Sequence, residues 1–138
     1  MVTQDLNTIE LYPGWLAYDP SVRWNVTFPF IEGGLNALSV VYITLEPGNS
    51  LPAHTDSAEE LWLVLEGSVE ATIGTERRPL HTGQLAAIPE MVSHELRNIG
   101  ATTARVVGVL ASTAIVSTFE QVVMPEGERV FHLAPMRA

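Results

Sequence analysis

The sequence predicts an all-β, antiparallel protein, built as a sandwich or a barrel. Short segments rich in Val, Ile, Leu and aromatic residues recur along the chain, and turn signals containing glycine or proline separate them. The chain has ten glycines and nine prolines, and none of its segments carries a long helical period bounded by capping residues. Closely spaced short strands of this kind are typical of antiparallel sandwiches and barrels with little helix.

Five strands follow from the alternation of apolar segments and turn signals. They are expected at residues 39–45, 60–65, 69–73, 84–88 and 104–110. Residues from about 1 to 30 contain Trp15 and Trp24, and they are expected to form an arm and first strands that pack on the sheet. Residues from about 118 to 138 are expected to form a loose tail, or a strand that is exchanged with a partner.

Chain length and composition predict a single globular domain over residues 1–138. A chain of this size can bury a hydrophobic core, and 46% hydrophobic with 17% charged residues excludes a disordered chain. The net charge of -9, with only seven Lys and Arg, argues against nucleic-acid binding, which needs clustered basic residues. Because there is no cysteine, disulfides and thiolate metal sites are excluded.

The first residues of the chain lack a basic start and an apolar run, so no signal peptide is expected. The longest apolar stretches, such as residues 61–65, are much shorter than the roughly 20 residues that a helix needs to cross a bilayer. We therefore expect a cytoplasmic protein that does not associate with a membrane.

Candidate metal ligands lie in a first motif that begins and ends with glycine. Residues i and i+2 of a strand face the same side, so His54 and Asp56 are expected to point together into the interior. Glu60 opens the next predicted strand, and Trp62 and Val64 share its face, which places Trp62 beside these residues. The motif reads Gly48-(x5)-His54-Thr55-Asp56-(x3)-Glu60-(x6)-Gly67.

A second histidine lies in a second motif that contains glycine and proline. Pro89 ends the strand predicted at 84–88, and His94 begins another strand on which Leu96 and Asn98 share its face. Imidazoles together with carboxylates are the ligand set for Fe(II), Mn(II), Ni(II), Co(II) or Zn(II). The motif reads Gly83-(x5)-Pro89-Glu90-Met91-(x2)-His94-(x3)-Asn98.

The two motifs together resemble the signature motifs of the cupin superfamily, read as G(x5)HxH(x3-4)E(x6)G and G(x5)PxG(x2)H(x3)N. The resemblance covers residues 48–98 directly and implies a double-stranded β-helix, or jelly-roll barrel. It also implies that His54, Asp56, Glu60 and His94 converge on one divalent transition metal per chain inside the barrel. A homodimer, formed by pairing or exchange of outer strands, is a further expectation from the family.

Asp56 stands where the family usually has a second histidine. As a direct ligand, it would complete a set of two imidazoles and two carboxylates, which favours Fe or Mn over Ni, Co or Zn. As a residue that orients a ligand or a metal-bound water, it would leave His54, Glu60 and His94 as the facial triad used for O2 activation. In a third interpretation, Asp56 marks a site that no longer binds metal.

Met91 occupies a position where the family has glycine. Either the local turn differs there, or Met91 places a flexible apolar side chain at the mouth of the pocket. The residues expected to contact a substrate are mostly apolar: Trp62, Val64, Leu96, Met91 and Tyr42. Such a lining favours an aromatic or polyketide-like substrate over a sugar.

The residues and the resemblance favour a metal-dependent enzyme that acts on a small organic molecule. A metal with open coordination positions suits a dioxygenase or oxygenase, or a lyase, isomerase or cyclase. Glu60 or Asp56 would exchange between metal ligation and proton transfer, and both are therefore candidate catalytic residues. Two alternatives stay open: a non-catalytic sensor that binds a small molecule, and a metal-free cupin that resembles a sugar epimerase and uses histidine as a base.

Overall fold

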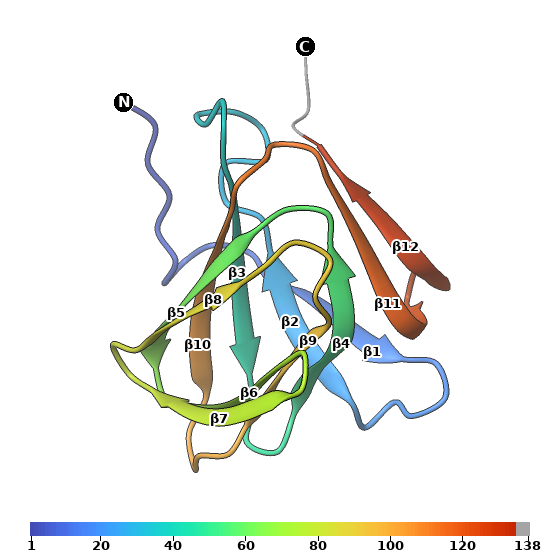
Figure 1. Ribbon diagram of the computed structural model, residues 1–138. Helices are drawn as coiled ribbons and strands as arrows, with labels where there is room; N and C mark the ends of the chain where they lie inside the picture. The colour runs from blue at the N-terminus through green and yellow to red at the C-terminus, as the bar shows by residue number, and fades with distance from the viewer. Residues whose placement is uncertain (135–138) are drawn as a thin grey trace.

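Antiparallel strands join edge to edge around an almost closed barrel in the computed structural model, which describes residues 1–134 (Figure 1). Within this range the chain forms twelve strands and no helix, so the expected all-β, antiparallel jelly-roll fold is confirmed. The strands are β1 (Tyr12–Leu16), β2 (Arg23–Thr27), β3 (Ser39–Leu45), β4 (Ser50–Asp56), β5 (Glu60–Glu66), β6 (Ser68–Ile73), β7 (Glu76–His81), β8 (Leu85–Ile88), β9 (His94–Asn98), β10 (Ala104–Leu110), β11 (Ile115–Met124) and β12 (Glu128–Leu133).

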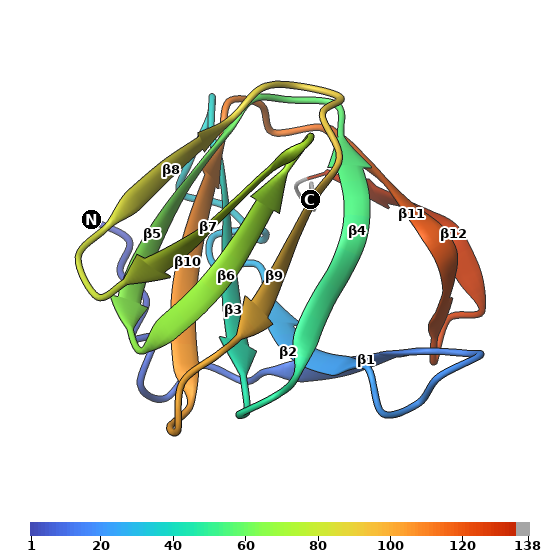
Figure 2. The same cartoon turned by 60° about the horizontal axis from the view of Figure 1, so that its bottom comes forward.

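The order of the strands brings together elements that are distant in the sequence. From one edge to the other the order is β7-β6-β9-β4-β11-β1-β2-β3-β10-β5-β8, and β12 pairs with β11 outside this path. Strands β4 and β9 pair with each other, whereas β5 pairs with β8 and β10 at the far end of the path. Because the sheet curls, these two parts face each other across the interior (Figure 2).

The structure confirms the five predicted strands. Strands β3 and β10 have the predicted bounds, and β5, β6 and β8 each differ from the prediction by one residue at one end. Strand β7 was not predicted, because half of its residues are charged and it contains Pro79. It forms as an edge strand that pairs only with β6 among the described residues, a position where exposed charges and proline are common.

The described part of the expected tail at residues 118–138 is not loose but forms strands, whereas exchange of a strand with a partner stays a prediction. Strand β11 begins at Ile115 and pairs with β1, β4 and β12 of its own chain. Its inner face is buried at alternate residues, including Ser117 and Phe119, which is why it is held against the barrel. Residues 135–138 of the expected tail lie outside the described residues.

The inward-facing positions of the strands form both the hydrophobic core and the wall of a cavity at the candidate site. The register of β3, β10 and β5 aligns Val41, Gly108 and Trp62 in one row across the sheet, and Val41 and Trp62 border a cavity. Val106 and Val64, paired in the next row that faces inward, are completely buried at 0% exposure and do not line the cavity. The inward face of β3, β10 and β5 therefore supplies both cavity wall and completely buried core residues.

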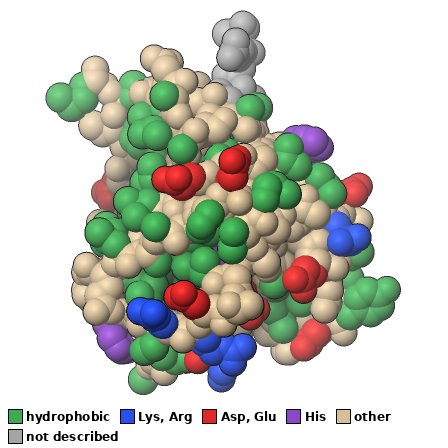
Figure 3. All heavy atoms as spheres, in the orientation of Figure 1, with side chains coloured by type: hydrophobic (Ala, Val, Ile, Leu, Met, Phe, Trp, Pro, Cys, Tyr) green, Lys and Arg blue, Asp and Glu red, His purple; other side chains and the backbone are tan. Residues whose placement is uncertain are grey.

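The outer surface mixes apolar and charged side chains. Figure 3 shows hydrophobic side chains spread over one face of the molecule, with separate acidic groups among them. Dispersed apolar residues of this kind are ordinary on protein surfaces. Residues 1–134 include no helix of the length and apolarity required to cross a membrane.

Met91 keeps the turn that glycine would make between β8 and β9. Its φ is 61°, in the left-handed region, and its N–H donates a hydrogen bond to the carbonyl oxygen of Asp56 at 2.8 Å. Its side chain is 60% exposed. The turn therefore has a conformation that glycine adopts readily and that strains a methionine backbone. The exposed methionine side chain contributes little burial to offset this strain.

We expect the Met91→Gly variant to have a higher free energy of unfolding than the wild type, by up to about 1 kcal/mol, because glycine adopts positive φ without steric cost. The Met91→Val variant should have a lower free energy of unfolding than the wild type, by about 1 kcal/mol or more, because a β-branched side chain fits this conformation poorly. Urea unfolding of the three proteins measures both effects. A Met91→Gly variant less stable than the wild type would contradict the assignment of strain to this turn.

Candidate metal centre

Neighbouring strands bring the predicted ligands together. His54 on β4 is the cross-strand partner of His94 on β9, and Asp56 lies two residues along β4 on the same inner face. Glu60 approaches from β5, on the opposing part of the barrel. All four residues sit in the interior, with exposures of 7% or less.

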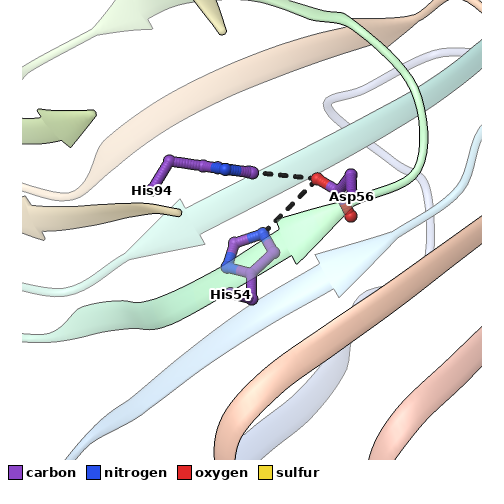
Figure 4. Close-up of side chains that lie close together, drawn as sticks. All are labelled: His54, Asp56 and His94. Atoms are coloured by element: carbon purple, nitrogen blue, oxygen red, sulfur yellow. Dashed lines mark hydrogen bonds and ion pairs between the residues drawn. The ribbon is translucent and has the colours of Figure 1, made fainter. Parts of the chain in front are cut away.

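The polar atoms of the four side chains converge on a small region, and Figure 4 shows three of them, His54, Asp56 and His94. Asp56 Oδ2 lies 3.0 Å from His94 Nε2 and 3.6 Å from His54 Nε2. Glu60 Oε1 lies 3.3 Å from His94 Nε2. One ligand atom each from His54, Asp56 and His94 lie within 4.8 Å of one another, and Glu60 adjoins this group through His94.

Backbone carbonyls determine how both imidazole rings are oriented. His54 Nδ1 lies 2.8 Å from the carbonyl oxygen of Pro52, and His94 Nδ1 lies 2.8 Å from that of Val92. Because a carbonyl oxygen can only accept a hydrogen bond, each Nδ1 carries the hydrogen and donates it. In the neutral rings the lone pairs are therefore on the two Nε2 atoms, which face the carboxylate of Asp56. Lone pairs directed at an anionic oxygen repel it, so a cation between them would stabilise this geometry.

The pKa values show how strongly the four groups interact. Burial, with the nearby His94, lowers the pKa of His54 to about 4. Burial also acts against a charged His94, but the hydrogen bond to Asp56 and the adjacent Glu60 carboxylate outweigh it and raise the pKa of His94 to about 9. Burial raises the pKa of Asp56, yet hydrogen bonds from His94 and Ser117 hold it below its usual value. Burial raises the pKa of Glu60. Without a metal, a proton on His94 is therefore the cation of the site at neutral pH.

Glu60 has an oxygen that lacks a hydrogen-bond donor. Glu60 Oε1 and Trp62 Nε1 are buried side-chain atoms with no hydrogen-bond partner among the described residues. His94 Nε2 can donate only one hydrogen, and Asp56 Oδ2 lies closer to it than Glu60 Oε1 does. A buried acceptor without a partner costs about 1–3 kcal/mol, and a metal ion between Glu60 and the histidines would remove this cost. The donor set and the unpaired oxygen both fit a divalent metal.

Gly108 makes room for the Glu60 carboxylate. It lies on β10 opposite Trp62, and a Cβ atom added there would overlap Glu60 Oε2 and lie 2.6 Å from Val41 Cγ1. A larger residue at position 108 would therefore displace the carboxylate from its place beside His94.

Two residues of β11 belong to the site and were missed in the sequence. Ser117 donates a hydrogen bond from its hydroxyl to Asp56 Oδ1, and the Phe119 ring stacks on His54 with 4.7 Å between ring centroids and 18° between planes. Ser117 pairs with Asp56 and Phe119 pairs with His54 across the β4–β11 ladder. Burial alternates along β11, but its inward positions mix apolar Ile115 and Phe119 with polar Ser117, so this segment, interpreted mostly as a tail, carried no clear signal in its sequence.

A cavity of about 170 Å³ adjoins the candidate ligands and is bordered by β1, β2, β3, β4, β5, β10, β11 and β12. Of the residues predicted to contact a substrate, Trp62 lines this cavity. The described lining leaves out Val64 and Leu96, which are fully buried in the core, and Met91, which is largely exposed.

Tyr42 was predicted to contact a substrate but faces away from the cavity. Arg105 Nε donates a hydrogen bond of 2.6 Å to the Tyr42 hydroxyl, and the guanidinium lies 5.6 Å from the centre of the Tyr42 ring. Arg105 also donates to Asn7 Oδ1 at 3.2 Å. Tyr42 therefore lies on the outer side of β3, beneath the N-terminal arm, because its neighbours Val41 and Ile43 take the inward positions.

The fold and the site define a jelly-roll barrel with a candidate metal centre in its interior. The family model described as "Cupin domain" matches residues 41–110, half of the chain, and the chain therefore belongs to the cupin family. No curated protein is similar enough in sequence to count as a match.

Solved cupin structures share the fold at low sequence identity. A sugar phosphate isomerase from Silicibacter pomeroyi is 20% identical, with 99% of this chain and 98% of that chain covered and a TM-score of 0.69. The cupin domain of Schizosaccharomyces pombe Cnp3 is 14% identical, with 80% and 74% covered and a TM-score of 0.66. An oxalate oxidase in complex with the substrate analogue glycolate is 23% identical, with 74% and 57% covered and a TM-score of 0.67. At these identities the likeness shows the fold.

We expect Gly108→Ala to lower the affinity for a divalent metal by about tenfold or more, because displacing a group that positions a ligand typically costs 10–100-fold. Some loss of stability, about 1–3 kcal/mol, is expected from the added methyl group. Affinity for Mn(II) and Zn(II), measured by competition with a chelator, tests this. The control is Gly100→Ala, whose added Cβ would meet no atom closer than 3.5 Å. Unchanged metal affinity in folded Gly108→Ala would show that Glu60 is not a ligand.

Metal uptake at pH 7 should release about one proton per chain, because His94, with a pKa of about 9, is protonated in the metal-free protein and must lose this proton to bind. The apparent metal affinity should therefore rise with pH, about tenfold per unit, and level off near pH 9. Titration calorimetry with Zn(II) in buffers of different ionisation enthalpy measures the number of protons. No proton release at pH 7 would contradict the raised pKa.

Proposed function

We propose that this protein is a metal-dependent cupin enzyme that acts on a small organic molecule in the cavity beside the metal. His54, Asp56, Glu60 and His94 would hold one divalent metal per chain. The observation that carries the proposal is the orientation of the two histidines, whose Nε2 atoms are turned toward Asp56 by hydrogen bonds from Nδ1 to backbone carbonyls. Neutral imidazoles held in this way bind a metal ion without rearrangement.

Asp56 is best explained as a direct ligand. Its Oδ1 accepts the hydrogen bond from Ser117, which leaves Oδ2 facing both Nε2 atoms. Two imidazoles and two carboxylates form a donor set that is harder than an all-histidine site, so Fe or Mn is favoured, with Ni, Co or Zn as alternatives.

Oxygenase chemistry, or a metal-assisted lyase, isomerase or cyclase reaction, is the proposed range of activity. The metal would supply Lewis-acid activation or O2 binding. Glu60, whose pKa burial raises, would hold or transfer a proton beside the bound molecule. Aromatic and aliphatic side chains keep the cavity apolar, which supports an aromatic or polyketide-like substrate. The cupin structures above include both an oxidase and an isomerase, so both reaction types are compatible with the fold.

A homodimer is the proposed assembly. Within residues 1–134, β12 pairs with β11 alone, so one edge of β12 is free to pair with another strand. An unpaired edge of this kind is a common site for strand addition. The cytoplasmic location and the absence of nucleic-acid partners stay predictions.

Metal content per chain, measured by elemental mass spectrometry on protein purified without a histidine tag, tests the proposal. We expect near-stoichiometric Fe or Mn, lost in His94→Ala and reduced by at least about tenfold in affinity in Asp56→Ala. Ser117→Ala should retain metal with a smaller loss, because it removes only the hydrogen bond to Asp56. O2 consumption with a panel of small aromatic molecules would then distinguish an oxygenase from a lyase or isomerase. Failure to bind metal after anaerobic reconstitution with Fe(II), Mn(II) and Zn(II) would leave a non-catalytic binding module as the better explanation.

A further inference from the structure

The cavity beside the candidate ligands has a size, a shape and a charge that restrict what can occupy it. We propose that it binds an uncharged molecule built on a single aromatic ring and excludes small anions such as dicarboxylates and phosphates. This deepens the proposed function by naming the substrate class of the same site. The cavity itself is formed by the barrel walls, so ligand binding can be measured independently of the metal.

The volume limits the ligand to about one ring. The cavity measures about 170 Å³. An apolar cavity of about 150 Å³ is known to accommodate benzene, so the space here is sufficient for a six-membered ring with a small substituent. A fused bicyclic molecule would require the walls to move.

Aromatic side chains give the cavity flat walls. The ring of Phe119 stacks with those of Trp24 and His54, with centroid distances of 6.0 and 4.7 Å and interplanar angles of 12° and 18°. Phe131 of β12 meets Phe119 edge to face at 5.7 Å. Trp62 contributes a further ring from β5 and meets His94 edge to face at 5.3 Å. Rings arranged in stacked and edge-to-face pairs favour a planar ligand that can continue the same contacts.

The described lining offers an anion no positive partner from the chain. Among residues 1–134 the lining includes neither Lys nor Arg, whereas Asp56, Glu60 and Glu126 contribute carboxylates. With Asp56 and Glu60 both ionised, their charges would offset that of a divalent metal. A buried anion without a partner loses several kcal/mol of hydration free energy, and no side chain of the described lining offsets this loss. An uncharged ligand avoids this cost.

The mouth of the cavity is also acidic. Tyr12 lines the cavity and is 55% exposed, which places it at the opening, and its hydroxyl donates a hydrogen bond to Glu10 at 3.4 Å. Glu126 lies in the turn between β11 and β12, exposed to solvent and still part of the lining. Carboxylates at an opening lower the local concentration of anions. Glu126 is therefore a specificity residue at the rim, away from the metal ligands.

Benzamide and benzoate test the proposal, because they have nearly the same shape and differ in charge. Binding to the full-length chain, with and without Zn(II), is measured by titration calorimetry and ligand-detected NMR. We expect benzamide to bind at one site per chain and benzoate to bind at least about tenfold more weakly. 1-Naphthamide should bind more weakly than benzamide. Benzoate binding as tightly as benzamide, or no benzamide binding to the folded protein, would overturn the proposal.

Charge reversal at the rim tests the role of Glu126. Glu126→Arg should reduce the preference for benzamide over benzoate by several-fold, mainly through tighter benzoate binding. Glu128→Arg makes the same change of charge on a residue of β12 that does not line the cavity, and it should leave the preference unchanged. Equal effects of the two substitutions would refute a specific role for Glu126.

The location is tested by Leu133→Trp, which fills the cavity from β12 and should weaken benzamide binding by at least tenfold. If that variant does not fold, the Glu126 and Glu128 variants still decide the charge preference. A chain that binds benzamide but never takes up metal would refute the proposed function and leave this inference standing. A chain that takes up metal and prefers benzoate would support the metal site of the proposed function and refute this inference.

Discussion

Two hydrogen bonds from imidazole Nδ1 atoms to backbone carbonyls determine the chemistry of this barrel. Each carbonyl belongs to the residue two positions before the histidine, so the orientation of the rings is set within β4 and just before β9. With the rings held in this way, both Nε2 atoms face the Asp56 carboxylate. Contact with Asp56 raises the pKa of His94, whereas burial and the neighbouring His94 lower the pKa of His54, so His94 holds the proton that the two imidazoles share.

Strand β11 links the fold to the site. It pairs with β4 on one side and with β1 on the other, so it connects the two ligands on β4 to the strands that border the cavity. Through Ser117 it orients Asp56, and through Phe119 it covers His54 with a ring that is also part of the cavity wall. The orientation of the candidate ligands and the shape of the cavity therefore depend on the same strand.

The sequence was sufficient to predict that the four candidate ligands lie close together, because their spacing lies within two short motifs, where the two-residue period of a strand determines which side chains share a face. Ser117 was not predictable in this way, since it pairs with Asp56 across 61 residues and only closure of the barrel brings them together. Tyr42 was misassigned because β3 is apolar on both faces, so hydrophobicity does not indicate the inward side. Val64 faces inward as predicted, but it is fully buried in the core. The alternation of residues along a strand indicates which face a residue occupies, and it does not indicate whether that residue borders the cavity.

The position of Glu60 has a consequence for how the chain holds its shape. Glu60 reaches His94 from the opposite wall of the barrel, so a metal bound to both would cross-link two sheet regions that β-ladders connect only through a long path of strands. The chain has no cysteine and can form no disulfide. A metal ion would take the place of such a covalent staple: it would close a loop of chain between β5 and β9, and part of its binding free energy would appear as folding stability. Metal supply would then regulate the lifetime of the folded protein as well as its activity.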